Sequence, residues 1–171
     1  MGILEDYVKQ TYRVLAGLIA LGVLVQAAAV AFGWFEVISD VETGQVFDEN
    51  SEFNLGHMVH LFGGMYVIPL LGLILLIVSF FAAKTVPNAR KWAGIVFGLI
   101  VLQVALAIFA FMLTPAIGAL HGVNALLLLG AAIRAQTLTR SSAVTRREGA
   151  GPVTVPAQST GSSAPEPSRS V

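Results

Sequence analysis

The sequence predicts an all-α membrane protein: a four-transmembrane-helix up-down bundle with both termini cytoplasmic and a disordered C-terminal tail. Composition is the first observation behind this prediction, because hydrophobic residues make up 56% of the chain and charged residues only 12%, against about 25% charge in soluble domains. The second is a set of uncharged tracts at 15–35, 53–83 and 92–133, each as long as the ~20 apolar residues that a membrane span needs. The third is that every Lys and Arg falls on one side of such a bundle.

The first two spans are predicted at 14–34 and 57–81, separated by an acidic external loop at 35–56. Small residues at 27–31 also allow the first span to be read as a secretory signal with a cleavage site, although its apolar part is long for a signal. Within the loop, β-branched and aromatic residues around Thr43-Gly44 predict a small hairpin.

The last uncharged tract is about twice the length of one span, and Thr114-Pro115-Ala116 divides it. Proline starts helices well and interrupts them from within, so two further spans are predicted at 92–113 and 116–135. Residues 1–140 then form one transmembrane domain. Residues 141–171 are rich in Ser, Thr, Ala, Pro and Gly. Such a segment cannot bury enough apolar surface to order itself, and we expect a disordered cytoplasmic tail.

The basic residues set the expected orientation. The four-span arrangement places all of them at the end that holds both termini: Lys9, Arg13, Lys84, Arg90, Lys91, Arg134, Arg140, Arg146, Arg147 and Arg169. The loop at 35–56 carries acidic charges alone: Glu36, Asp40, Glu42, Asp48, Glu49 and Glu52. Because cytoplasmic loops retain Lys and Arg, we expect a multi-pass protein of a bacterial cytoplasmic membrane. Its partner is then the lipid bilayer, and no nucleic acid is expected. The chain has no cysteine, which excludes disulfides and c-type haem attachment.

Two histidines, His60 and His121, are predicted near the external ends of the second and fourth spans. Both lie some 6–8 Å into their helices at ~1.5 Å per residue. These two helices run in the same direction and are diagonal neighbours in an up-down bundle. Ionisable residues within spans are read as functional by default. We therefore expect the two imidazoles to meet at one depth.

Small residues share the helix faces of both histidines. Gly63 and Gly64 lie three and four positions after His60, and Gly118 lies three before His121. A flat macrocycle between two helices needs an imidazole from each and little side-chain bulk where it meets the backbone. The leading hypothesis is therefore a haem b held by His60 and His121.

Polar neighbours complete the predicted haem site. Asn124 shares the face of His121 and is placed to orient a bound ligand. Gln103 in the third span, like Gln26 in the first, could donate to a haem propionate, to a quinone carbonyl or to a neighbouring helix. No nucleophile–base pair is visible, so the chain offers no sign of an enzyme.

Two alternatives to haem remain open. The histidines could serve as interhelical hydrogen-bonding groups that pack the helices, as in a non-catalytic membrane subunit or an assembly factor. They could instead bind a copper or zinc ion, and such a metal site would need His57 as a third ligand beside His60 and His121. A quinone-binding protein belongs to this same class of small-ligand membrane proteins.

The motifs GHMVHLFGG at 56–64, VLQVALAIFAF at 101–111 and LHGVNALLLLG at 120–130 resemble one half of the haem A synthase family. That resemblance implies that His60 and His121 are haem ligands. The chain departs from that family beside His60, which is flanked by Val59 and Leu61. The family places a glutamate and an arginine near its second-helix histidine. A homodimer would rebuild the eight helices of that family, and electron transfer would need a respiratory redox partner. The chain also resembles uncharacterised bacterial four-helix membrane proteins with a domain of unknown function, which implies no activity.

Overall fold

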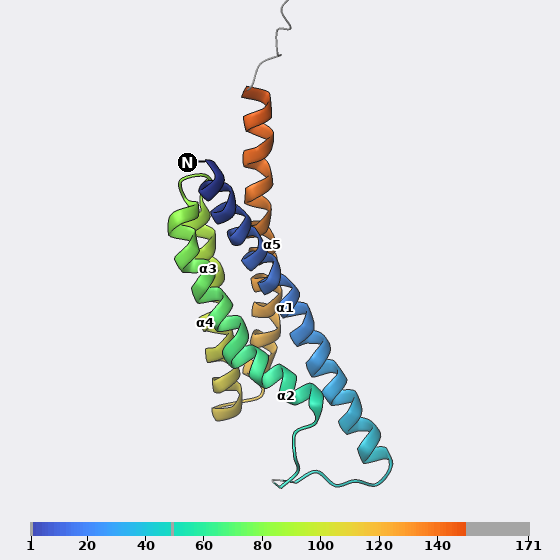
Figure 1. The fold of residues 1–171 in the computed structure, drawn as a ribbon. Helices are drawn as coiled ribbons and strands as arrows, with labels where there is room; N and C mark the ends of the chain where they lie inside the picture. Colours follow the sequence, from blue (N-terminus) through green and yellow to red (C-terminus); the bar gives the residue numbers. More distant parts are fainter. Residues whose placement is uncertain (1, 49, 150–171) are drawn as a thin grey trace, which may run out of the picture.

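The computed structural model describes residues 2–48 and 50–149, with side chains up to Thr139. The elements in chain order are α1 (Gly2–Glu42), α2 (Leu55–Phe62), a π-helical turn η1 (Gly63–Val67), α3 (Ile68–Ala82), α4 (Ala89–Met112) and α5 (Ala116–Gly149) (Figure 1). Four helical segments in this described part are long and apolar enough to cross a membrane: Gly2–Glu42, Leu55–Ala82, Ala89–Met112 and Ala116–Thr139. The predicted all-α class and four-span organisation are confirmed, and the chain is an integral membrane protein.

Helix α1 is longer at both ends than the predicted span 14–34. It ends in a Schellman motif, in which Gly44 has a φ of +93° and the Gln45 N–H donates to the Asp40 carbonyl at 3.0 Å. The predicted hairpin around Thr43-Gly44 is therefore wrong, because this glycine terminates a helix. The connection to the next helix is 43–54, shorter than the expected 35–56.

The second span is one helical path with a widened turn in its middle. Asn54 caps its start, because the Asn54 side chain accepts from the His57 N–H at 3.0 Å and donates to the Gly33 carbonyl at 2.8 Å. At η1 the Ile68 N–H reaches back to the Gly63 carbonyl, a step of one extra residue. Pro69 follows, and it has no N–H to continue the regular ladder. The path bends at this turn (Figure 1).

The remaining turns follow the sequence signals closely. Asn88 adopts a left-handed conformation with φ 61° at the start of α4. Pro115 separates α4 from α5, and the Thr114 hydroxyl accepts from the Ala116 N–H at 3.3 Å. Helix α5 begins at the predicted residue but continues to Gly149, so residues 141–149 are helical where a disordered tail was expected. The rest of the predicted tail, 150–171, lies outside the described residues.

The four spans form a ring in which α1 and α4 each pack against both α3 and α5. We name its two ends the loop end, which carries the 43–54 connection, and the terminal end, which carries the N-terminus and the 83–88 turn (Figure 1). The buried apolar core lies mainly toward the terminal end, with large members Tyr12, Ile19, Leu75, Val86, Val96 and Ile100. At the loop end, α2 packs on α1.

Tyr12 ties the terminal end together across one diagonal of the ring. Its side chain is fully buried, and its hydroxyl donates to the Ala89 carbonyl of α4 at 3.2 Å. The opposite diagonal, between the second and fourth spans, is bridged toward the loop end by the two histidines described below.

Helices α1 and α2 approach each other closely at Gly56. A Cβ atom at Gly56 would lie 2.5 Å from the Ala29 carbonyl oxygen and 2.5 Å from the Gly33 nitrogen, both main-chain atoms of α1. Neither atom can move without moving the helix. A side chain at this position would therefore force the two helices apart, and with them the segment that carries His60.

Replacing Gly56 by alanine should therefore lower stability by about 1–3 kcal/mol, the usual range for overpacking. Thermal unfolding in detergent, followed by circular dichroism, measures this change. Gly98→Ala is the matched control, because a Cβ at Gly98 meets no atom within 4 Å. Equal unfolding temperatures for the two variants would contradict the close approach.

Candidate functional site

His60 and His121 come together toward the loop end, as the sequence predicts. Their ring centroids are 6.1 Å apart and their planes are inclined at 65°. Each histidine lies at the same place relative to the start of its helix, about 7.5 Å along the axis at ~1.5 Å per residue. The pair thus spans the diagonal between α2 and α5.

The His60 ring is held by α1. Its Nδ1 lies 3.1 Å from the main-chain carbonyl oxygen of Gln26. The Gln26 side chain returns the contact, because its Nε2 donates to the Val59 carbonyl at 3.2 Å. Gln26 therefore joins α1 to α2 through two contacts, one of its main-chain carbonyl and one of its side-chain amide.

The His121 ring is held by α4 in the same manner. Its Nδ1 lies 3.0 Å from the main-chain carbonyl oxygen of Gln103, and the Gln103 Nε2 donates to the His121 carbonyl at 3.0 Å. The site therefore consists of two similar halves, each a glutamine on one helix and a histidine on the next.

These hydrogen bonds fix the tautomer of both imidazoles. A carbonyl oxygen only accepts, so the Nδ1 atom of each ring must carry the proton. In the neutral ring the Nε2 atom then keeps its lone pair. Among the described residues neither Nε2 has a hydrogen-bond partner. Both histidines therefore present the nitrogen that a metal centre or a hydrogen-bond donor would use.

Asn124 extends the network on the α5 side. Its side chain is 3% exposed, and its Nδ2 donates to the Leu99 carbonyl at 2.9 Å and to the Gln103 Oε1 at 2.6 Å. Both partner atoms are acceptors, so the Asn124 atom that faces them must be the amide nitrogen, which sets the orientation of the amide. Asn124 therefore fixes Gln103, and Gln103 fixes His121.

The predicted glycines have different surroundings. Cβ atoms at Gly63 and Gly64 would meet the side chain of Gln26, so these two positions make room for that glutamine. A Cβ at Gly118 would meet no atom within 4 Å, so this face of α5 is open. Small residues beside His60 thus serve the packing of α1, and Gly118 is the predicted glycine with space beside it.

His57 does not join the pair. Its ring lies edge-on to Trp34 at 5.4 Å and to Phe53 at 6.2 Å between centroids, at the start of α2. The described part of the chain contains no group of three or more His, Asp or Glu side chains placed to hold a metal ion. The predicted trio of His57, His60 and His121 is thus not assembled.

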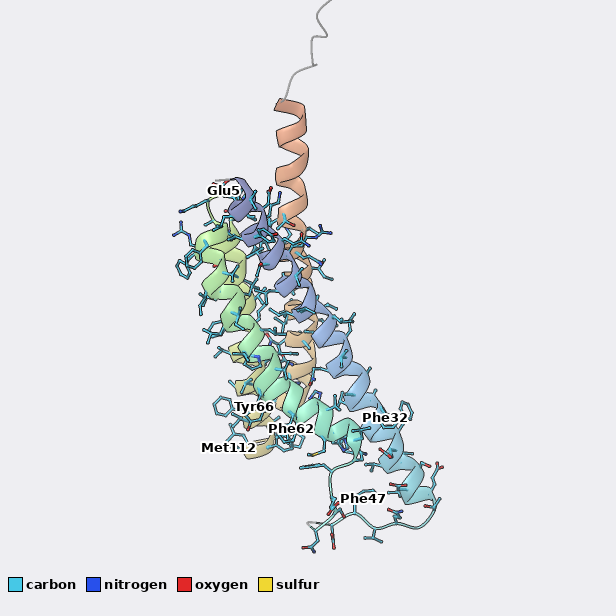
Figure 2. All side chains as sticks on the ribbon, viewed as in Figure 1. Glu5, Phe32, Phe47, Phe62, Tyr66 and Met112 are labelled. Carbon is cyan, nitrogen blue, oxygen red and sulfur yellow. The ribbon has the colours of Figure 1, made fainter. Side chains whose placement is uncertain are left out.

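Two exposed aromatic side chains lie on the outside of the bundle toward the loop end. Phe62 stacks on Tyr66 with ring centroids 5.9 Å apart, and Met112 at the end of α4 lies at the same level (Figure 2).

Beyond the helices, the Asn50 N–H donates to the Asp48 carboxylate at 2.9 Å and lowers the pKa of that carboxyl. The 43–54 connection therefore stays anionic.

Gln26 is the site residue that the sequence did not place beside a particular histidine, although donation to a neighbouring helix was among its predicted uses. A signal for it exists, because Gln26, Ala28 and Phe32 in α1 match Gln103, Ala105 and Phe109 in α4 in a Q-x-A-x-x-x-F pattern. Each pattern precedes a histidine-bearing helix. Comparing the two helical pairs would have assigned Gln26 the role that Gln103 has.

Comparisons with protein-family models, with curated proteins and with solved structures give no match.

Replacing Asn124 by leucine, which has a similar volume, should lower stability by about 1–3 kcal/mol, because the buried Gln103 Oε1 would lose its donor. Thermal unfolding in detergent tests this expectation. Ser79→Ala is the control, since this buried hydroxyl bonds within its own helix, to the Leu76 carbonyl at 2.6 Å. An Asn124→Leu protein as stable as the control would show that the Asn124 bond to Gln103 adds nothing.

Proposed function

We propose that this protein binds one haem b between His60 and His121 and serves in electron transfer within the membrane. The observation that supports it is the pair of imidazoles that meet across the bundle, each with Nδ1 on a main-chain carbonyl and Nε2 unpartnered among the described residues.

The separation of the rings suits two axial ligands. Two metal–nitrogen bonds of about 2 Å, with about 1 Å from each nitrogen to its ring centre, put trans imidazole centroids about 6 Å apart. The measured centroid distance is 6.1 Å. The same distance lies within the range of about 4.5–7 Å for rings that pack edge to face, so it is compatible with ligation and with packing.

The hydrogen bonds also suit metal ligands. Histidines that bind metals nearly always donate their other ring N–H to a carbonyl or a carboxylate, which fixes the ring and raises its basicity. Both rings have such a carbonyl partner, from Gln26 and from Gln103. The chain's own residues thus hold both imidazoles in the tautomer that ligation through Nε2 requires.

A bound haem would supply one-electron chemistry, and two protein imidazoles would fill both axial positions. Such a site favours electron transfer over substrate chemistry. The chain has no Lys or Arg in 14–83 or in 92–133, so haem propionates would have amide groups or water as partners. Gly118, with open space beside it, is the predicted residue best placed to admit a flat ring.

The site lies on the loop side, which we propose faces the exterior of a bacterial cytoplasmic membrane. The support is the positive-inside rule, since the described Lys and Arg belong to the terminal end. A redox partner of this haem would then meet it from the external side. A homodimer would give two such sites.

The competing role is packing. The bonds from His60 to α1 and from His121 to α4 tie neighbouring helices, as expected of structural histidines in a membrane subunit or an assembly factor. This role accounts for both Nδ1 bonds, and it assigns nothing to the two Nε2 atoms. A metal ion could also bind those atoms, and a quinol hydroxyl could donate to them, whereas a quinone carbonyl is itself an acceptor.

A double variant, His60→Ala with His121→Ala, should purify without haem, because both candidate ligands are gone. The pyridine haemochrome assay on detergent-purified protein, expressed with ample haem, measures the haem per chain. His57→Ala is the matched control and should keep the wild-type content, because His57 contacts Trp34 and Phe53 instead. Haem retained in the double variant would refute the proposed site.

A further inference from the structure

The two halves of the site differ at one position. Three residues after His121 stands Asn124, whereas three residues after His60 stands Gly63. Asn124 donates to the Oε1 of Gln103, but no described residue donates to the Oε1 of Gln26, which is buried. The two histidines are therefore supported unequally.

His121 has the more extensive support, and within it only the buried Asn124 Oδ1 has no donor among the described residues. Gln103 makes three contacts: it accepts from His121 through its main-chain carbonyl, donates to the His121 carbonyl and accepts from Asn124. Asn124 is anchored in turn on the Leu99 carbonyl. These residues belong to α4 and α5, which pack against each other. Turning the His121 ring away would break a buried network.

His60 has the weaker support. The Gln26 side chain makes one hydrogen bond, to the Val59 carbonyl, and its buried Oε1 has no donor among the described residues, whereas the Gln103 Oε1 accepts from Asn124. Helix α2 packs on α1, and it continues into the π-helical turn Gly63–Val67. Movement of His60 therefore disturbs fewer contacts than movement of His121.

We propose that His121 is the permanent ligand of the site and His60 the exchangeable one. The proposal rests on the haem assignment above. Were a haem held there, His60 would be the residue that gives way to a neutral ligand bringing its own lone pair, and His121 would stay in place. The class of ligand is a small uncharged molecule, because the surroundings are apolar and hold no Lys or Arg.

Carbon monoxide is the probe. Dithionite-reduced, haem-loaded full-length protein in detergent should bind CO at saturation, with a single shifted Soret band. His60→Ala should keep most of its haem and bind CO faster, while His121→Ala should retain at least about tenfold less haem. That factor is the lower end of the usual loss when a metal site is weakened.

A matched pair of glutamine variants tests the same asymmetry without removing a ligand. Gln103→Leu should weaken haem retention by about 10–100-fold, the usual range for a group that positions a metal ligand. Gln26→Leu should weaken it less, because Gln26 Oε1 has no donor among the described residues to lose. Transfer of haem from each loaded variant to a competing apo-protein acceptor gives the two retention constants.

The outcomes separate the two proposals. Wild-type protein without haem refutes the haem assignment itself. Wild-type protein with one haem that excludes CO, or equal loss of haem from His60→Ala and His121→Ala, refutes only the exchangeable His60. If Gln26→Leu weakens haem retention as much as Gln103→Leu does, or more, that result also refutes only the exchangeable His60. CO binding with the predicted order of haem loss supports the assignment of His60.

Discussion

The hydrogen bond from each histidine Nδ1 to a main-chain carbonyl on the preceding span is the constraint on which the site depends. It settles the tautomer, aims the ring across the bundle and joins helices in pairs, α1 with α2 and α4 with α5. A carbonyl in a helix is immobile, so the rings are positioned by the backbone, and the glutamine side chains that return the contact prevent sliding. In an apolar bilayer such polar contacts have few competitors.

Different interactions stabilise the two ends of the bundle. Toward the terminal end, apolar side chains and the Tyr12 bond to Ala89 hold the ring of helices together. Toward the loop end, polar contacts replace much of this packing, and Asn124 is among the few fully buried polar residues. A site in this position draws its stability from a core some distance away. Under the proposed assignment, exchange of a ligand at His60 would leave this core intact.

The sequence predicted the spans because long apolar tracts and Pro115 leave little choice, and it predicted the meeting of His60 and His121 because equal depth on diagonal helices follows from helical geometry. It missed the end of α1, because a glycine that closes a helix and a glycine in a hairpin look the same in a composition window. It allowed Gln26 to donate to a neighbouring helix, as its side chain does, but did not place Gln26 at His60, since the group that holds the ring is a main-chain carbonyl. The unequal support of the two histidines depends on Asn124 and Gly63, whose contacts only the packed structure gives.

The central claim is that two similar Gln–His pairs, supported unequally, hold one haem. The reduced-minus-oxidised optical spectrum of wild-type protein, purified in detergent after expression with ample haem, tests it most directly. A narrow α-band of the b type, with about one haem per chain, is the result expected from two axial imidazoles. A flat spectrum with no bound haem would contradict the claim. His60 and His121 would then be residues that pack the helices or bind a colourless ligand.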